Sequence, residues 1–176
     1  MDIKIIYAVS ENGVIGQNNQ IPWNIPDELT HFKEITANGI LIMGRKTYDS
    51  LPASGLPGRV LIVVSGKNAD AINCSTTNCD IIAVRSFGEA LATVKLLNCI
   101  TSRCVFVVGG AELIKAAINI AVGLVVSVIH FIVNDHPTNI TVNPVDLSTW
   151  ELVRSNKRVD RLSGVEFDIN HYVKRI

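Results

Sequence analysis

The stretch best suited to chemistry is GQNNQIPWNIPDEL, which runs from Gly16 to Leu29. It places Trp23 between two prolines and then sets two carboxylates, Asp27 and Glu28, side by side. A buried carboxylate can accept paired hydrogen bonds from a cationic or amino-bearing ligand. Burial also raises its pKa into a range useful for moving a proton. The stretch therefore suggests recognition of such a ligand, combined with proton chemistry.

A helix predicted over residues 26–37 decides which carboxylate faces inward. Pro26 suits its first turn, and successive residues advance by about 100°. An inward Glu28 is costly without a partner, and its own face offers no basic residue, so a ligand could fill that place. The alternative is an ordinary, partly exposed acid favoured by the helix dipole. On this spacing one face holds Glu28, Leu29, Phe32 and Ile35, and the opposite, polar face holds Asp27, His31 and Glu34.

Trp23 and the loop before it suggest a pocket wall with a movable cover. The flanking prolines stiffen the chain, and the indole N–H stays available for a hydrogen bond. The preceding ENGVIGQNNQ is polar and contains Gly13 and Gly16, as is typical of mobile loops. Such a loop beside a rigid wall would exclude water from an active site. The alternative is a surface loop with an incidental tryptophan.

The composition limits the possible functions. The chain has 176 residues, of which 48% are hydrophobic and 18% charged, so it is not a disordered protein. A net charge of +0 argues against broad capture of nucleic acid or anionic membrane. The start MDIKIIYAV is not a secretory signal, and no apolar run is long enough to span a bilayer. We therefore expect a soluble, cytoplasmic monomer without nucleic-acid or membrane partners.

Three short patterns carry no function. Cys74 and Cys79 share their spacing with Cys99 and Cys104, but no histidine pair accompanies them, so we expect no metal site. GRKT resembles the end of a phosphate-binding P-loop, yet Arg45 replaces the required glycine. The sequons NCS and NIT are chance matches.

Alternating apolar runs and helical patterns predict one α/β domain over residues 1–176. Several runs are apolar on both faces, as in parallel strands covered by helices. WELVRSNKRV and VEFDINHYV flank DRLSG and predict an antiparallel hairpin at one edge of a mainly parallel sheet. Ligands of such sheets bind beyond the carboxyl ends of the strands. Strands are predicted at 3–9, 40–43, 59–65, 80–84, 104–108 and 124–133, helices at 26–37, 46–51, 87–97 and 111–118, and a loop at 134–144.

At this point the sequence resembles the dihydrofolate reductase family along nearly its whole length. The matching pieces keep the family's order and separations, and the first of them is highly specific. They are VIGQNNQIPWNIPDELTHFK, IMGRKTYDSLP, LPGR, VVSG and VVGGAELI. The resemblance implies an NADPH-dependent oxidoreductase that reduces 7,8-dihydrofolate to tetrahydrofolate, supports one-carbon metabolism and thymidylate synthesis, and binds antifolates.

The resemblance implies roles for the substrate residues. Glu28 would hold N3 and the 2-amino group of the pterin, with a water shared with Ser127, which is usually threonine in the family. Trp23 would close over the nicotinamide, and Arg59 would grip the α-carboxylate of the glutamate tail, for which its planar fork is suited. Further substrate contacts are implied for Ile6, Tyr7, Ala8, Leu29, Phe32, Lys33, Leu51, Leu56 and Val108.

The resemblance also implies the NADPH site. Arg45, Lys46 and Thr47 would contact the phosphates, with Ser65 and Arg85 near the adenosine 2′-phosphate. Gly109 and Gly110 match a pair joined by a cis peptide. Hydride would pass from nicotinamide C4 to pterin C6, with a proton delivered to N5. No G-x-G-x-x-G fingerprint is present, so the common dinucleotide fold is not indicated. The remaining implied cofactor residues are Ala8, Ile15, Gly16, Gly44, Val64, Gly66, Val108, Ala111, Glu112 and Leu113.

Some positions depart from the family pattern. Tyr48 replaces a tryptophan or phenylalanine, Ile114 replaces an aromatic residue, and Glu112 adds a negative charge near the cofactor. In the family, an Asp-Thr pair followed by an aromatic residue and Pro is expected at 139–144 and holds the active-site flap. Here NITVNP matches that motif only weakly, so the sequence does not predict that the flap is held in the same way. Two alternatives stay open: a reductase of another pterin or pyrimidine, which would not need Arg59, and a non-enzymatic protein with this fold.

Overall fold

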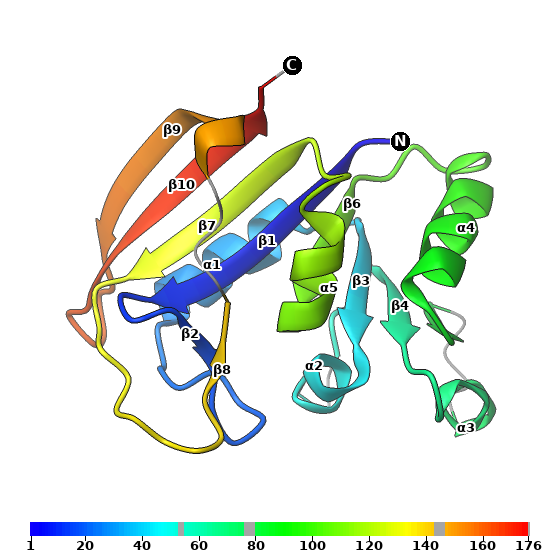
Figure 1. Cartoon of the computed structure of the whole chain (residues 1–176), viewed down its shortest axis with the longest axis horizontal. Coiled ribbons are helices and arrows are strands. Elements are labelled where there is room, and N and C mark those ends of the chain that lie inside the picture. The colour runs from blue at the N-terminus through cyan, green and yellow to red at the C-terminus, as the bar shows by residue number, and fades with distance from the viewer. Residues whose placement is uncertain (53–54, 76–79, 143–146, 176) are drawn as a thin grey trace.

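The computed structural model describes residues 1–52, 55–75, 80–142 and 147–175. Its centre is an eight-stranded sheet in the order β5-β4-β3-β6-β1-β7-β10-β9 (Figure 1). The neighbours from β5 to β7 pair in parallel, and β10 and β9 are antiparallel. The predicted mainly parallel sheet with an antiparallel edge hairpin is confirmed. The strands are β1 (Ile3–Ser10), β3 (Ile40–Gly44), β4 (Val60–Val64), β5 (Ile81–Val84), β6 (Val105–Gly109), β7 (Gly123–Ile129), β9 (Trp150–Val159) and β10 (Glu166–Lys174).

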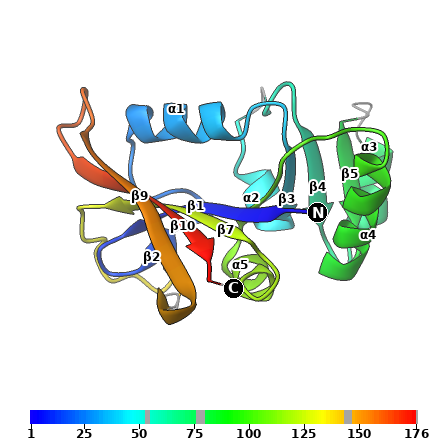
Figure 2. The same cartoon turned by 90° about the horizontal axis from the view of Figure 1, so that it is seen from above.

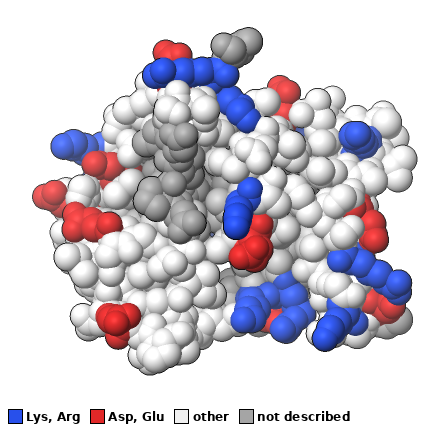
Figure 3. Space-filling view, viewed as in Figure 1, with Lys and Arg blue, Asp and Glu red and all other residues white. Residues whose placement is uncertain are grey.

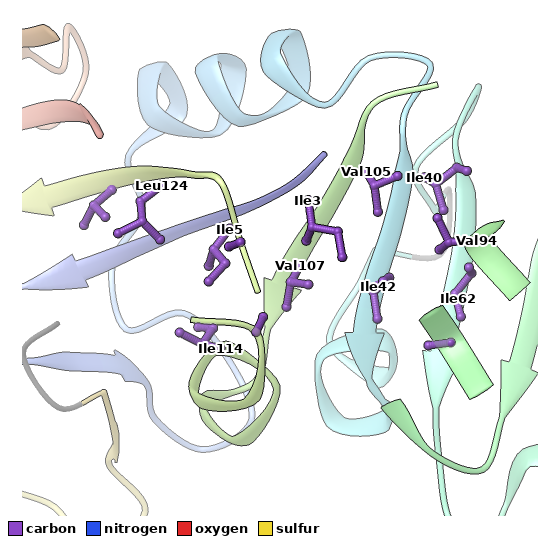
Figure 4. Packing of buried hydrophobic residues seen from close by; sticks show 14 of the residues in the cluster. Ile3, Ile5, Ile40, Ile42, Ile62, Val94, Val105, Val107, Ile114 and Leu124 are labelled. Carbon is purple, nitrogen blue, oxygen red and sulfur yellow. The ribbon is translucent and has the colours of Figure 1, made fainter. Parts of the chain in front are cut away.

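Helices cover both faces of the sheet, which explains why its central strands are apolar throughout. The α1 helix lies on one face and α5 on the other (Figure 2). Every residue from Ile40 to Met43 in β3 is fully buried, because alternate side chains enter the two cores. One core includes Ile5, Ile42 and Ile114 (Figure 4), and the other includes Phe106 and Phe167. The helices are α1 (Pro26–Ile35), α2 (Arg45–Asp49), α3 (Ala69–Ser75), α4 (Phe87–Asn98) and α5 (Ala111–Ala117), with a 3₁₀ turn at Leu147–Thr149.

The ends of three predicted elements shift by two residues or more. The helix predicted at 46–51 is observed as Arg45–Asp49. The α1 helix ends at Ile35, two residues early, where the Thr36 hydroxyl donates to the carbonyl of Phe32 and Asn38 takes a left-handed φ of 56°. The predicted strand at 124–133 ends at Ile129, because the chain turns there and leaves the sheet.

Two features of the chain were missed by the pattern analysis. The α3 helix was not predicted, and β2 (Val14–Gly16) pairs with β8 (Ile140–Thr141) in a separate two-stranded sheet. Such short strands show no measurable alternation, so both lay in segments predicted as loops. Residues 143–144 of the predicted loop lie outside the described residues.

The predicted faces of α1 are partly wrong. Glu28 is buried as expected, but Leu29 is 45% exposed and His31, assigned to the polar face, is only 7% exposed. The reason is the edge hairpin, which comes against the side of the helix: the ring of His31 lies 6.1 Å from the ring of His171 in β10. Spacing along a helix shows which residues share a face, but not which faces a curved sheet covers.

Candidate active site

The carboxylate of Glu28 lies at the start of α1, above the sheet. Glu28 is 9% exposed, and burial raises its pKa, while a hydrogen bond from Ser127 opposes this rise. Ser127 is buried in the middle of β7, in register with Ala8 of β1. Among the described residues no cation pairs with Glu28. The predicted inward acid is therefore present, with donor capacity beside it and a raised pKa suited to proton chemistry.

Trp23 contributes a buried polar group, its indole Nε1, without a hydrogen-bond partner among the described residues. A buried N–H costs free energy unless a partner is supplied. Trp23 packs against the same core as the residues that follow, so a polar atom entering there would find this donor.

The apolar residues predicted to contact substrate gather on the α1 face of the sheet. Ile6, Ala8, Trp23, Phe32, Leu51, Leu56 and Val108 all belong to one cluster there. Tyr7 is the exception, because its side chain packs in the cluster on the opposite face, where burial raises its pKa to about 12. Any contact of Tyr7 with a ligand beside Glu28 is therefore a main-chain contact. Leu29 and Lys33 are exposed at the rim.

Arg59 lies buried at the far end of α1. Its guanidinium donates to the hydroxyl of Thr36 and to the carbonyls of Pro57 and Lys33, and burial lowers its pKa. A cavity of about 220 Å³ adjoins it, lined partly by Leu56 and Leu61. Arg59 thus holds the end of α1 in place and still has further N–H donors for an anion.

Residues predicted to hold the cofactor meet where strands β3 and β6 end. A side chain on Gly44 would lie 3.6 Å from the amide nitrogen of Gly110, and one on Gly109 would lie 3.2 Å from Oγ1 of Thr47. The Gly109–Gly110 peptide is cis, as the resemblance implied, and Gly109 has a φ of 138°. The absence of side chains at these glycines lets the ends of β3 and β6 pack closely against each other and against Thr47. Ile15, Val64 and Leu113 pack beneath it, on the α5 face.

Basic residues border this region beyond the neighbouring strand ends. Lys and Arg side chains gather beside α2 and α3 at the lower edge of Figure 3. Arg45 and Lys46 follow β3, and Arg85 follows β5. Arg45 pairs with Asp49 at 2.6 Å, and Arg85 with Asp70 at 2.7 Å. Ser65 is buried at the end of β4, with Gly66 exposed beside it. These residues therefore lie at or just beyond strand ends, and their contact with an anion stays a prediction.

Comparisons with known proteins identify the family. A sequence model of dihydrofolate reductase matches residues 2–174. The dihydrofolate reductase of Neisseria gonorrhoeae is 32% identical over 174 residues, 98% of each chain. The type 9 enzyme of Escherichia coli is 44% identical over 95 residues, 54% of this chain and 51% of that protein. The dihydrofolate reductase of Enterococcus faecalis, solved with NADP(H) and RAB-propyl, has a TM-score of 0.82 at 25% identity, covering 99% of this chain and 97% of that one. This chain belongs to the dihydrofolate reductase family.

In this member of the family the predicted flap, residues 11–20, is braced despite its divergent partner segment. Gln17 donates to Oδ1 of Asn139 at 2.7 Å, and the Thr138 hydroxyl donates to the side chain of Asn18 at 2.7 Å. The amide of Val142 donates to the carbonyl of Gly13 at 3.1 Å. These contacts accompany the β2–β8 pairing. The doubt raised by NITVNP about this bracing is therefore removed.

The other departures have plain structural outcomes. Ile114 is fully buried in the α5-side core, Glu112 is exposed on α5, and Tyr48 packs against the α1-side cluster. Among the described residues, no group of three or more His, Cys, Asp or Glu side chains could hold a metal ion. Cys79 and the side chain of Cys74 lie outside that set. None of the described helices is long and apolar enough to cross a membrane.

The hairpin turn DRLSG brings to the start of α1 residues that the sequence analysis did not connect with the site. Asp160 accepts a hydrogen bond from the amide of Asp27, and Arg161 pairs with the carboxylate of Asp27. An Asp opening a turn is a weak signal in the sequence. Its partner lies 133 positions away, so no spacing rule could have found the contact.

Proposed function

We propose that this protein reduces 7,8-dihydrofolate to tetrahydrofolate with NADPH, and that Glu28 anchors and polarises the pterin. The observation that carries the proposal is the buried carboxylate of Glu28 beside Ser127, with no cation among the described residues to neutralise it. Family membership confirms the enzyme class and the cofactor, because dihydrofolate reductases are NADPH-dependent oxidoreductases. The anchoring of the pterin and the proton delivery are our proposals.

Glu28 suits the amino-bearing edge of a pterin. A carboxylate can accept two parallel hydrogen bonds from N3 and the 2-amino group, and so fixes both position and orientation. These bonds supply the partners that a buried carboxylate needs. Ser127 and Glu28 then share a water. The negative charge of Glu28 polarises the pterin and so raises the proton affinity of its N5. Trp23 and the braced flap exclude bulk water from the reacting atoms.

The residues at the strand ends fit NADPH, which supplies the hydride. The glycines at the ends of β3 and β6 keep Thr47 and the Gly109–Gly110 peptide close together, and Arg45, Lys46 and Arg85 supply positive charge beyond the neighbouring strand ends. Arg45 and Arg85 each keep donors beyond those used with Asp49 and Asp70. Three basic groups near one rim favour a cofactor with the extra 2′-phosphate.

The test measures NADPH oxidation in the presence of dihydrofolate. Glu28→Gln keeps the shape of the side chain but cannot accept both pterin hydrogen bonds, so we expect kcat/KM to fall by at least about tenfold. Glu34→Gln, an exposed position on the same helix, is the matched control and should leave activity unchanged. Full activity of Glu28→Gln would remove Glu28 from the mechanism, and an inactive parent protein would overturn the proposed reaction.

Arg59 separates dihydrofolate from a substrate without a glutamate tail. Arg59→Ala should raise KM for dihydrofolate but leave KM unchanged for a dihydropterin that lacks the tail. Comparing both substrates in one variant cancels any effect of the lost hydrogen bonds to Thr36, Pro57 and Lys33. Equal changes for the two substrates would show that Arg59 acts only as a structural residue.

A further inference from the structure

The α1 helix begins without a cap of its own. Its N-cap residue is Ile25, whose side chain can accept no hydrogen bond. The first amides of a helix have no partners within the helix and need an outside acceptor. Here Oδ1 of Asp160 accepts from the amide of Asp27 at 2.9 Å. The cap of α1 is therefore supplied by the turn of the β9–β10 hairpin.

Asp160 is itself held rigidly by that turn. It is 1% exposed, and its second oxygen accepts from the amide of Ser163 at 2.7 Å, from the Ser163 hydroxyl at 2.8 Å and from the amide of Leu162 at 3.2 Å. These hydrogen bonds, with the one from Asp27, lower the pKa of Asp160 to about 2. Asp160 is thus a fixed negative charge at the positive end of the helix dipole.

The contact runs in both directions. The carboxylate of Asp27 accepts from the amide of Arg161 at 3.1 Å and from its guanidinium at 2.7 Å. The arrangement differs from a capping box, in which two residues exchange side-chain and backbone hydrogen bonds, because the return bond comes from Arg161, the residue after Asp160, and the contact joins two separate elements. We call Asp27, Asp160 and Arg161 the α1 clamp.

The hairpin that forms the clamp also places Ser127. Ile169 of β10 lies in register with Ser127 of β7, and the turn before β10 holds Asp27, the residue next to Glu28. One element therefore fixes both sides of the Glu28–Ser127 pair. If the first turn of α1 frayed, Glu28 would lose its defined position relative to β7.

We propose that Asp160 is a positioning residue that acts through Glu28: the α1 clamp holds the first turn so that the Glu28 carboxylate meets the amino-bearing edge of the ligand. This inference rests on the proposed function, because it assumes that Glu28 binds that edge. It extends the active-site architecture to the edge hairpin, which contains none of the predicted substrate or cofactor residues.

The first test measures binding of a 2,4-diaminopyrimidine and KM for dihydrofolate in Asp160→Ala. The dissociation constant of the diaminopyrimidine and the KM for dihydrofolate should both rise on the order of tenfold. This is the ratio to which the free energy of one lost helix cap corresponds. NADPH affinity should stay unchanged, because none of its predicted residues lies in α1 or in the β9–β10 hairpin. Asp160→Asn, which keeps one acceptor oxygen, should recover part of the loss. Leu162→Ala, which changes an 83% exposed side chain of the same turn and keeps every hydrogen bond of Asp160, should bind the diaminopyrimidine normally.

A double-mutant cycle with Glu28→Gln decides whether Asp160 acts through Glu28. If it does, adding Asp160→Ala to Glu28→Gln weakens diaminopyrimidine binding no further. Additive losses, an equal loss of NADPH affinity, or unchanged binding in Asp160→Ala would each overturn the inference. Should Asp160→Ala fail to fold, Arg161→Ala, at an exposed position, takes its place with a smaller loss in the same direction. The failure of the proposed function is distinguishable, because then Glu28→Gln alone would leave dihydrofolate reduction intact.

Discussion

The bracing of the flap can be tested by removing one side chain, that of Asn139. Its Oδ1 accepts from Nε2 of Gln17 at 2.7 Å, and its Nδ2 donates to the carbonyl of Asn134 at 3.0 Å. The substitution Asn139→Ala removes both hydrogen bonds. The backbone pairing between β2 and β8 remains, so the flap can still close but is held less strongly.

The expected size follows from these two bonds. A hydrogen bond contributes about 0.5–1.5 kcal/mol net, and partly exposed bonds lie at the lower end. The two together contribute about 1–2 kcal/mol. Since about 1.4 kcal/mol is a factor of ten, the equilibrium for opening the flap should shift by about five- to thirtyfold.

Hydrogen exchange of flap amides measures this shift directly. The amides of Val142 and Asn18 donate to Gly13 and to the Thr138 hydroxyl, each at 3.1 Å, so their protection reports on the closed flap. Their exchange should become about tenfold faster in Asn139→Ala, while core amides of β3 keep their protection. Under the proposed function, single-turnover hydride transfer should slow as well.

The control is Asp135→Ala. Asp135 is exposed in the same segment, and its side chain makes no hydrogen bond with the described residues. Unchanged protection in Asn139→Ala, or the same change in Asp135→Ala, would show that the Gln17–Asn139 contact does not brace the flap.

Two further predictions concern the pterin and cofactor sides of the site. Burial raises the pKa of Glu28 above its ordinary 4.5. At pH values between the pKa of the unfolded chain and the raised pKa of the folded protein, the folded protein binds more protons, so its stability falls as pH rises. Ligand-free Glu28→Gln should therefore unfold at a higher temperature than the parent near about pH 7, with the gain vanishing near about pH 4; a gain independent of pH would contradict the burial argument. Gly109→Ala should cost about 1–3 kcal/mol in unfolding free energy, because its φ of 138° disfavours a side chain that would also lie 3.2 Å from Thr47, and NADPH titration should show weaker binding. Gly55→Ala, with a φ of 60° but nothing within 4 Å, should leave NADPH binding unchanged, so an equal loss there would refute the role of the close approach.

Patterns along the chain predicted the elements that dense packing determines. Ile40–Met43 could only be a covered strand, because all four side chains are apolar and β3 is buried on both faces. The hairpin around DRLSG was equally plain, because turn residues separate two long strand patterns. Glu28 was found because a charged residue within an apolar stripe is rare and costly.

What escaped prediction depends on contacts between distant segments. The burial of His31 arises from His171, the bracing of the flap from Thr138 and Asn139, and the cap of α1 from Asp160. In each case a polar side chain contacts a partner more than a hundred residues away in the sequence, through ring packing for His31 and through hydrogen bonds for the others, and no periodicity records such a pair. The resemblance to the family could not supply them either, since the segment at 134–144 departs from its pattern.

These distant contacts surround Glu28, whose buried carboxylate carries a desolvation cost. Glu28 is a buried acid whose hydrogen bond from Ser127 only partly offsets its desolvation, so burial of this carboxylate lowers the stability of the ligand-free fold. A helix start that was free to fray could relieve this cost by turning Glu28 toward water. The α1 clamp prevents that escape, because Asp160 is anchored in the hairpin whose β10 strand also pairs with the strand of Ser127. Under the proposed function, the desolvation cost of Glu28 is then offset by hydrogen bonds from a ligand rather than by solvent. Glu28 should therefore favour ligands whose amino-bearing edge can supply those bonds.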